Sequence, residues 1–137
     1  MVRMLRRTFT VAEANAALPE VRRLTERIVE RSARLPELHE DLRIRTYRAR
    51  REGALDSDQE AVAFAAADLR RAEIDLAEAL RDLGRAGVQL KDMMEGVVDF
   101  PSVREGRPVE LCWRVGEPEV AHWHTLGGGF ASRQPLS

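Results

Sequence analysis

The sequence predicts an α+β protein, mainly α, in which a long antiparallel helical hairpin precedes a small antiparallel β-sheet of about three strands. Three observations support this: two long stretches repeat apolar residues with a helical period, the pattern changes to alternation after Gly87, and Gly and Pro punctuate the alternating part. The 137-residue chain has the usual size of one domain. We therefore expect a single domain over residues 1–137, with the hairpin in 11–86 and the β-rich part in 88–137.

The first helix is predicted to begin near residue 11, because Thr10 and Glu13 have the spacing of a capping box. Pro19 fits poorly inside a helix, since it lacks an N–H and crowds the preceding turn. The sequence favours a short helix that ends near Ala17 and a new helix with Pro19 in its first turn. One kinked helix is the alternative. Pro36 is expected to kink or interrupt the helix again.

Both predicted helices carry seams with a seven-residue repeat. In the first helix an apolar row, Val21, Ile28, Leu35 and Leu42, runs beside a mostly polar row, Leu18, Thr25, Ser32 and His39. The second helix follows a connection at residues 52–56 and a capping box at 57–60, and alternates Val62, Leu69, Leu76 and Leu83 with Ala65, Ala72 and Ala79. Large-small alternation lets two helices approach closely. Net charges of +6 on residues 1–51 and −7 on 52–100 also favour pairing of the two arms.

Composition and charge argue against several classes of protein. The net charge of −1 gives no field that would recruit nucleic acid or an anionic membrane, and the Arg-rich segment 43–51 is interpreted as a charged helix end. No run is long and apolar enough to cross a membrane, and the basic start of the chain lacks the apolar core of an export signal. Cys112 is the only cysteine, so an internal disulfide is impossible. We expect a cytoplasmic protein.

Short strands are predicted at residues 97–100, 109–115 and 119–124. A turn at residues 116–118 sets a register that keeps one face of the last hairpin apolar. The same register places Cys112 across from His122, and Glu110 across from His124, where opposed Cβ atoms lie about 4.5–5.5 Å apart. These four side chains are candidate ligands of a divalent transition metal such as zinc, nickel or iron. A solvated polar face, or one covered by the tail, is the alternative.

The turn itself contributes one more candidate. Pro118 fixes its own φ and pushes Glu117 towards an extended conformation, so the turn aims the carboxylate of Glu117. A carboxylate held there could orient His122 or His124 for a ligand. A solvated turn residue is the alternative. Cys112, on a strand, is expected to be inert, because the chain shows no spacing typical of a nucleophilic triad.

Several strings carry a resemblance to a known family. They are Phe9-Thr10 with Glu13-Ala14-Asn15, Leu18-Pro19, residues 87–92, Val98 to Pro101, Leu111 to Pro118, Trp123 through Phe130, and Arg133 with Pro135-Leu136. With them the chain resembles the bacterial and archaeal family known as domain of unknown function 2203, over nearly its whole length. The resemblance implies the same fold and no reaction, cofactor or partner. In that family the position of His122 is often aromatic, which shifts weight to His124, Glu117 and Asp99. Arg114 and Arg133 complete the candidate ligand-facing residues.

Two functions remain open. The first is a non-enzymatic binding or protein-interaction module that forms a homodimer through its hairpin, because two helices bury only one stripe each. Its interface should exceed about 1,200 Å². The alternative is a metal-dependent or acid–base enzyme centred on Asp99, Glu117, His122 and His124.

Overall fold

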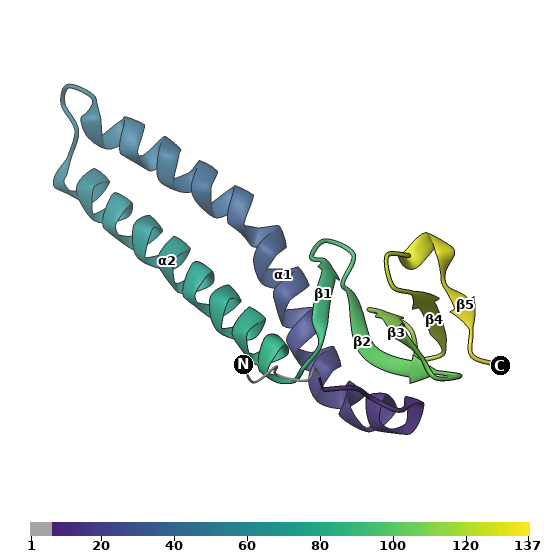
Figure 1. Ribbon diagram of the computed structural model, residues 1–137. Coiled ribbons are helices and arrows are strands. Elements are labelled where there is room, and N and C mark those ends of the chain that lie inside the picture. Colours follow the sequence, from purple (N-terminus) through teal and green to yellow (C-terminus); the bar gives the residue numbers. More distant parts are fainter. Residues whose placement is uncertain (1–6) are drawn as a thin grey trace, which may run out of the picture.

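The computed structural model describes residues 7–137 and shows two long helices followed by a five-stranded antiparallel sheet (Figure 1). The elements are α1 (Val11–Arg50), α2 (Asp56–Arg85), β1 (Gln89–Asp92), β2 (Val97–Arg104), β3 (Arg107–Arg114), β4 (His122–Thr125), a 3-10 turn (Phe130–Ser132) and β5 (Gln134–Pro135). The strands lie in chain order. The predicted fold class is confirmed, although the sheet has more strands than expected. Residues 1–6, on which the export-signal argument rests, lie outside the described residues.

Each helix begins with a carboxylate that binds a main-chain N–H. Thr10 Oγ1 accepts from the N–H of Glu13 at 3.0 Å, and the Glu13 carboxylate accepts from the N–H of Thr10 at 2.9 Å. This capping box confirms the predicted start of α1. At α2 the predicted box at residues 57–60 is wrong. The N–H of Leu55 instead donates to the Asp58 carboxylate at 2.8 Å, so the helix begins earlier, with half of a box.

The helix α1 is continuous from residue 11 to residue 50, with Pro19 and Pro36 inside it. The favoured prediction of a break before Pro19 is therefore wrong, and Figure 1 shows the first turns of α1 bending relative to the rest. Both prolines are exposed, so the carbonyls that lose their helical partner can bind water. Leu18 and Val21, buried on either side of Pro19, hold the helical path.

Fully buried residues between the helices are confined to one half of the hairpin. The predicted seam of α2 is buried at Ala65, Leu69, Ala72, Leu76, Ala79 and Leu83. In α1 the last buried residue is Ile28, and beyond it Leu35 and Leu42 are only half-buried. We call residues 29–64 the distal half; it projects away from the sheet (Figure 1). Although both helices are long, neither contains a stretch that is apolar enough to span a membrane.

The sheet packs one face on the base of the hairpin. Val98, Phe100, Leu111 and Trp113 of β2 and β3 join Val21, Leu24, Ile28, Leu76, Ala79 and Leu83 of the helices in one core. The first turns of α1 are tied to the C-terminal part by Asn15, whose side chain accepts from the N–H of Val120 at 2.8 Å and donates to its carbonyl at 3.2 Å. Because successive side chains of a strand point to opposite faces, the residues between these core positions lie on the other face of the sheet, which can carry polar side chains.

Candidate functional site

The sheet face opposite the core carries five polar side chains that we call the polar layer: Asp99 on β2, Glu110 and Cys112 on β3, and His122 and His124 on β4. The predicted register is confirmed, since Cys112 pairs with His122 and Glu110 pairs with His124. The pairing of β2 with β3 adds Asp99 opposite Cys112. Side chains of paired residues share a face, so three strands contribute to one layer.

Three members of the polar layer form a buried cluster. The potential ligand atoms of Asp99, Cys112 and His124 all lie within 4.8 Å of one another. None of the three residues is more than 2% exposed. His124 Nδ1 lies 2.9 Å from the carbonyl oxygen of Thr125, and Nε2 lies 3.0 Å from Asp99 Oδ2. Because a carbonyl only accepts, Nδ1 carries a proton and donates it to Thr125, and Nε2 faces the carboxylate.

Glu110 borders the cluster through Lys91. The Lys91 ammonium lies 3.8 Å from Asp99 Oδ2 and 3.9 Å from Glu110 Oε1. Within residues 7–137, Asp99 Oδ1 and Glu110 Oε2 are buried and have no hydrogen-bond partner. A buried polar group left without a partner costs about 1–3 kcal/mol. One half-exposed ammonium therefore faces two buried carboxylates, and the site favours additional positive charge.

Cys112 has no exposed surface. Burial, together with the negative charge of Asp99 beside it, raises the pKa of the Cys112 thiol to about 12. A thiol with such a pKa is almost entirely protonated at neutral pH and is a poor nucleophile. In the absence of a bound cation, this agrees with the prediction that Cys112 is inert.

Glu117 and His122 form a second group at the edge of the polar layer. The Glu117 carboxylate accepts from the main-chain N–H of Arg114 at 2.8 Å and from Arg133 Nη1 at 2.9 Å. Burial raises the pKa of Glu117, but the hydrogen bonds from Arg133 and Arg114 outweigh it and hold the pKa below its ordinary value. His122 Nδ1 lies 4.0 Å from this carboxylate, beyond hydrogen-bond distance. The turn thus aims Glu117 at Arg133, and a ligand-facing role for it stays a prediction.

Of the four predicted metal ligands, the structure brings Cys112 and His124 together, places Glu110 beside them through Lys91, and turns His122 towards Glu117. Asp99, singled out only through the family resemblance, supplies the third member of the cluster. Asp99 lies opposite Cys112 because a two-residue turn joins β2 to β3 and sets their register. In that turn Glu105 and Gly106 both adopt positive φ.

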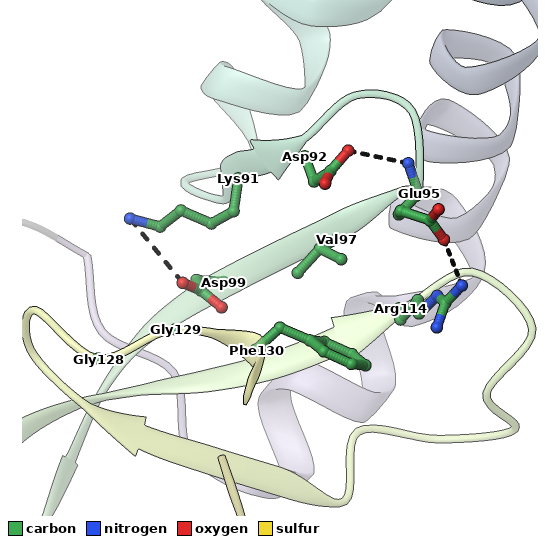
Figure 2. A pocket seen from close by; sticks show the side chains of 9 residues that line it. All are labelled: Lys91, Asp92, Glu95, Val97, Asp99, Arg114, Gly128, Gly129 and Phe130. Atoms are coloured by element: carbon green, nitrogen blue, oxygen red, sulfur yellow. Dashed lines mark hydrogen bonds and ion pairs between the residues drawn. The ribbon is translucent and has the colours of Figure 1, made fainter. Parts of the chain in front are cut away.

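A cavity of about 480 Å³ opens beside Asp99, one member of the cluster (Figure 2). Its lining includes Lys91, Asp99, Arg114 and Phe130. The guanidinium carbons of Arg114 and Arg133 lie 5.5 Å and 4.0 Å from the centroid of the Phe130 ring, which holds that ring at the wall. Asp99 belongs to both the cluster and the cavity, so a small molecule in the cavity would reach the cluster there.

The sequence prediction missed Lys91 as a site residue because it missed β1. That strand is four residues long and includes Lys91 and Asp92, which are uncommon in strands. The alternation of apolar and polar residues in 88–91 was the available signal, and these residues also lie in one of the strings that carried the family resemblance.

A family model described as Uncharacterized conserved protein (DUF2203) matches residues 7–136. The chain belongs to the DUF2203 family. The resemblance inferred from the sequence is therefore confirmed over nearly the whole chain. No curated protein and no solved structure matches this DUF2203 protein.

Proposed function

We propose that this DUF2203 protein is a non-enzymatic binding module that forms a homodimer through the distal half of its hairpin. The observation that carries the proposal is the lack of burial there: no residue between Ile28 and Ala65, a stretch described throughout, is buried. Two helices that project without a third element leave most of their surface to solvent, and helices depend largely on tertiary packing for stability. A partner over the distal half would supply that packing.

Exposed apolar side chains favour a protein partner. Phe64 and Tyr47 are 71% and 70% exposed, and Leu55 and Ile44 are also exposed in the distal half. Large apolar side chains that gather on an exposed face commonly mark an interaction surface. Leu35 and Leu42, half-buried between the helices, would become fully buried under a second layer.

Charge favours a second copy of the chain as the partner. The described ion pairs between α1 and α2 involve Arg27 and Arg31 with Asp75 and Glu78, which lie in or near the packed half of the hairpin. Further out, the described pairs lie within one helix, such as Arg43 with Glu40. The basic arm and the acidic arm therefore keep charge that is not matched across the hairpin. A two-fold axis would lay each basic arm on the partner's acidic arm.

Light scattering of the full chain at micromolar concentration tests the proposal. We expect the mass of a dimer, and Phe64→Glu should weaken association by at least about tenfold, because a charge would enter an apolar interface. Met94→Glu is the matched control, since Met94 is 84% exposed and lies outside the hairpin. A monomeric wild-type protein would refute the proposal, and a dimer that tolerates Phe64→Glu as well as it tolerates Met94→Glu would refute the interface.

A second candidate function is an acid–base or metal-dependent enzyme with its site on the polar layer. The observation in its favour is the Asp99–His124 contact of 3.0 Å beside a cavity of about 480 Å³. A carboxylate and an imidazole at this distance can transfer a proton to or from a bound molecule.

Screening small molecules for thermal stabilisation, followed by mass spectrometry of the stabilising compounds, tests this candidate. Chemical conversion that Asp99→Asn abolishes and Glu119→Gln preserves would favour an enzyme, since Glu119 is exposed outside the polar layer. Binding without conversion would favour the binding module instead.

A further inference from the structure

We propose that Asp99, Cys112 and His124 together bind one divalent transition-metal ion, for which Zn²⁺ fits best. The ion would lie in the polar layer, on the sheet face opposite the core. The proposal does not depend on how the hairpins associate, and it specifies a ligand whether the polar layer serves binding or catalysis.

The geometry needs little adjustment. Zn²⁺ binds sulfur at about 2.3 Å and imidazole nitrogen or carboxylate oxygen at about 2.0–2.2 Å. In a tetrahedral site, ligand atoms at such distances lie about 3.3–3.7 Å from one another. The three ligand atoms here already lie within 4.8 Å of one another, on side chains fixed by three adjacent strands. Small side-chain movements would complete the site.

The hydrogen bonds of His124 favour a cation. Its Nδ1–H donates to the carbonyl of Thr125 at 2.9 Å, an arrangement that commonly orients a metal-binding imidazole. A neutral ring then presents the lone pair of Nε2 to Asp99 Oδ2, 3.0 Å away. Two acceptors at this distance repel each other unless a cation interacts with both. A metal ion removes the conflict, and a second proton on the ring is the competing solution.

The unpartnered oxygens of Asp99 and Glu110 also favour a bound cation. Asp99 Oδ1 and Glu110 Oε2 are buried and, over the part of the chain that the structure describes, lack hydrogen-bond partners. The nearby Lys91 supplies a single positive charge from 3.8 Å and 3.9 Å. When a dication binds the Cys112 thiolate and the thiol proton passes to solvent, the charges of the ion, both carboxylates, the thiolate and Lys91 sum to zero. Arg133 also lies beside the Cys112 thiol, and its charge is matched by Glu117.

The donor set selects the class of metal. One oxygen, one sulfur and one nitrogen ligand do not suit Ca²⁺ or Mg²⁺, which prefer oxygen alone. Thiolate and imidazole suit Zn²⁺ and its neighbours in the transition series. Three protein ligands leave a fourth position free for water or another ligand. Because Asp99 also lines the cavity, that position is accessible from the cavity.

Titration of untagged, EDTA-treated full-length protein with Co²⁺ and then Zn²⁺ tests the site. We expect one equivalent of Co²⁺, a thiolate-to-cobalt charge-transfer band, and displacement by Zn²⁺. Asp99→Asn, Cys112→Ser and His124→Gln should each weaken binding by more than about 100-fold, beyond the roughly 10–100-fold loss caused by removing an outer partner. His122→Gln is the matched control, an imidazole on the same strand that faces Glu117, and it should bind like the wild type.

The proposal fails if the wild-type protein takes up no stoichiometric Co²⁺ or Zn²⁺, or if its cobalt complex lacks the thiolate band. It also fails if binding survives both Asp99→Asn and His124→Gln, or if His122→Gln abolishes it. Circular dichroism checks that each variant folds. If a variant does not fold, the thiolate-to-cobalt band of the wild-type protein still tests whether Cys112 binds the metal, because the chain has one cysteine. Light scattering on the same samples separates this result from that of the hairpin proposal.

Discussion

Cys112 shows how burial determines the chemistry of a side chain. It is fully buried in β3, and its thiol pKa is raised from an ordinary 9.0 to about 12. Metal-free native protein should therefore react with iodoacetamide at about pH 8 far more slowly than protein unfolded in urea, which should take up one equivalent. Mass spectrometry measures both rates. Equal rates would show that the thiol is accessible.

The same pKa makes stability depend on pH. A thiol whose pKa is higher in the folded state stabilises the fold fully below the unfolded pKa, and this contribution is lost as pH rises towards the folded pKa. Between about pH 8 and pH 10, metal-free wild-type protein should lose about 1.4 kcal/mol of unfolding free energy relative to Cys112→Ala. Urea denaturation at the two pH values measures the difference. A constant gap between the two proteins contradicts the prediction.

Glu117 gives stability the opposite dependence on pH. Its pKa is lowered, so its contribution is present above the unfolded pKa, near 4.3, and is lost as pH falls through the folded value. Glu117→Gln should cost about 1–2 kcal/mol at neutral pH, because the amide keeps only one acceptor oxygen and carries no charge to pair with Arg133. The gap to wild type should close in acid. Glu119→Gln, on the exposed neighbour, is the control. A gap that persists in acid would show that the carboxylate charge is not responsible.

At the scale of elements, the close approach of α1 and α2 depends on small residues. Ala79 has no exposed surface and belongs to the core at the base of the hairpin, while Ala77 on the same helix is exposed. Ala79→Leu should destabilise the protein by about 1–3 kcal/mol through overpacking. Ala77→Leu should change stability by less than about 0.5 kcal/mol. Urea denaturation compares the two, and equal effects would show that space between the helices is not limiting.

Elements also differ in how well their sequences predict them. The β3–β4 register was predictable because strict alternation fixes which residues face the core. The predicted turn at 116–118 and the strand start at 119 were wrong, because the connection runs over residues 115–121. The strands β1 and β5 were missed because they have four and two residues and carry Lys91, Asp92 and Pro135, which strands disfavour. The break expected at Pro19 failed because local propensity was outweighed by the burial of Leu18 and Val21. The contact between Asp99 and His124 also depends on the register of β2 with β3, which the turn at Glu105 and Gly106 sets. The predicted strand at 97–100 ended before that turn, so it specified no register for Asp99.

At the scale of the whole molecule, burial is concentrated at the sheet end. In a Phe64→Glu monomer, amide hydrogens of the distal half should exchange faster than those of β3, because they lack tertiary packing. In the wild-type dimer that we propose, the distal half should be protected more strongly than in the variant. Hydrogen exchange with mass spectrometry measures both. Unchanged distal protection between the two proteins would mean that the hairpin stands alone.

The pairing of Asn15 with Val120 has a consequence for biosynthesis. The two residues are 105 positions apart, and each hydrogen bond between them fixes the start of α1 against the C-terminal part. As the chain leaves the ribosome, α1 and α2 can pair as soon as both have emerged, since their contacts are local to the hairpin. Asn15 has no partner until Val120 has emerged. The nascent hairpin therefore exposes its apolar base until the strands of the sheet have been made, and a chain truncated before residue 120 should be a substrate for chaperones and proteases.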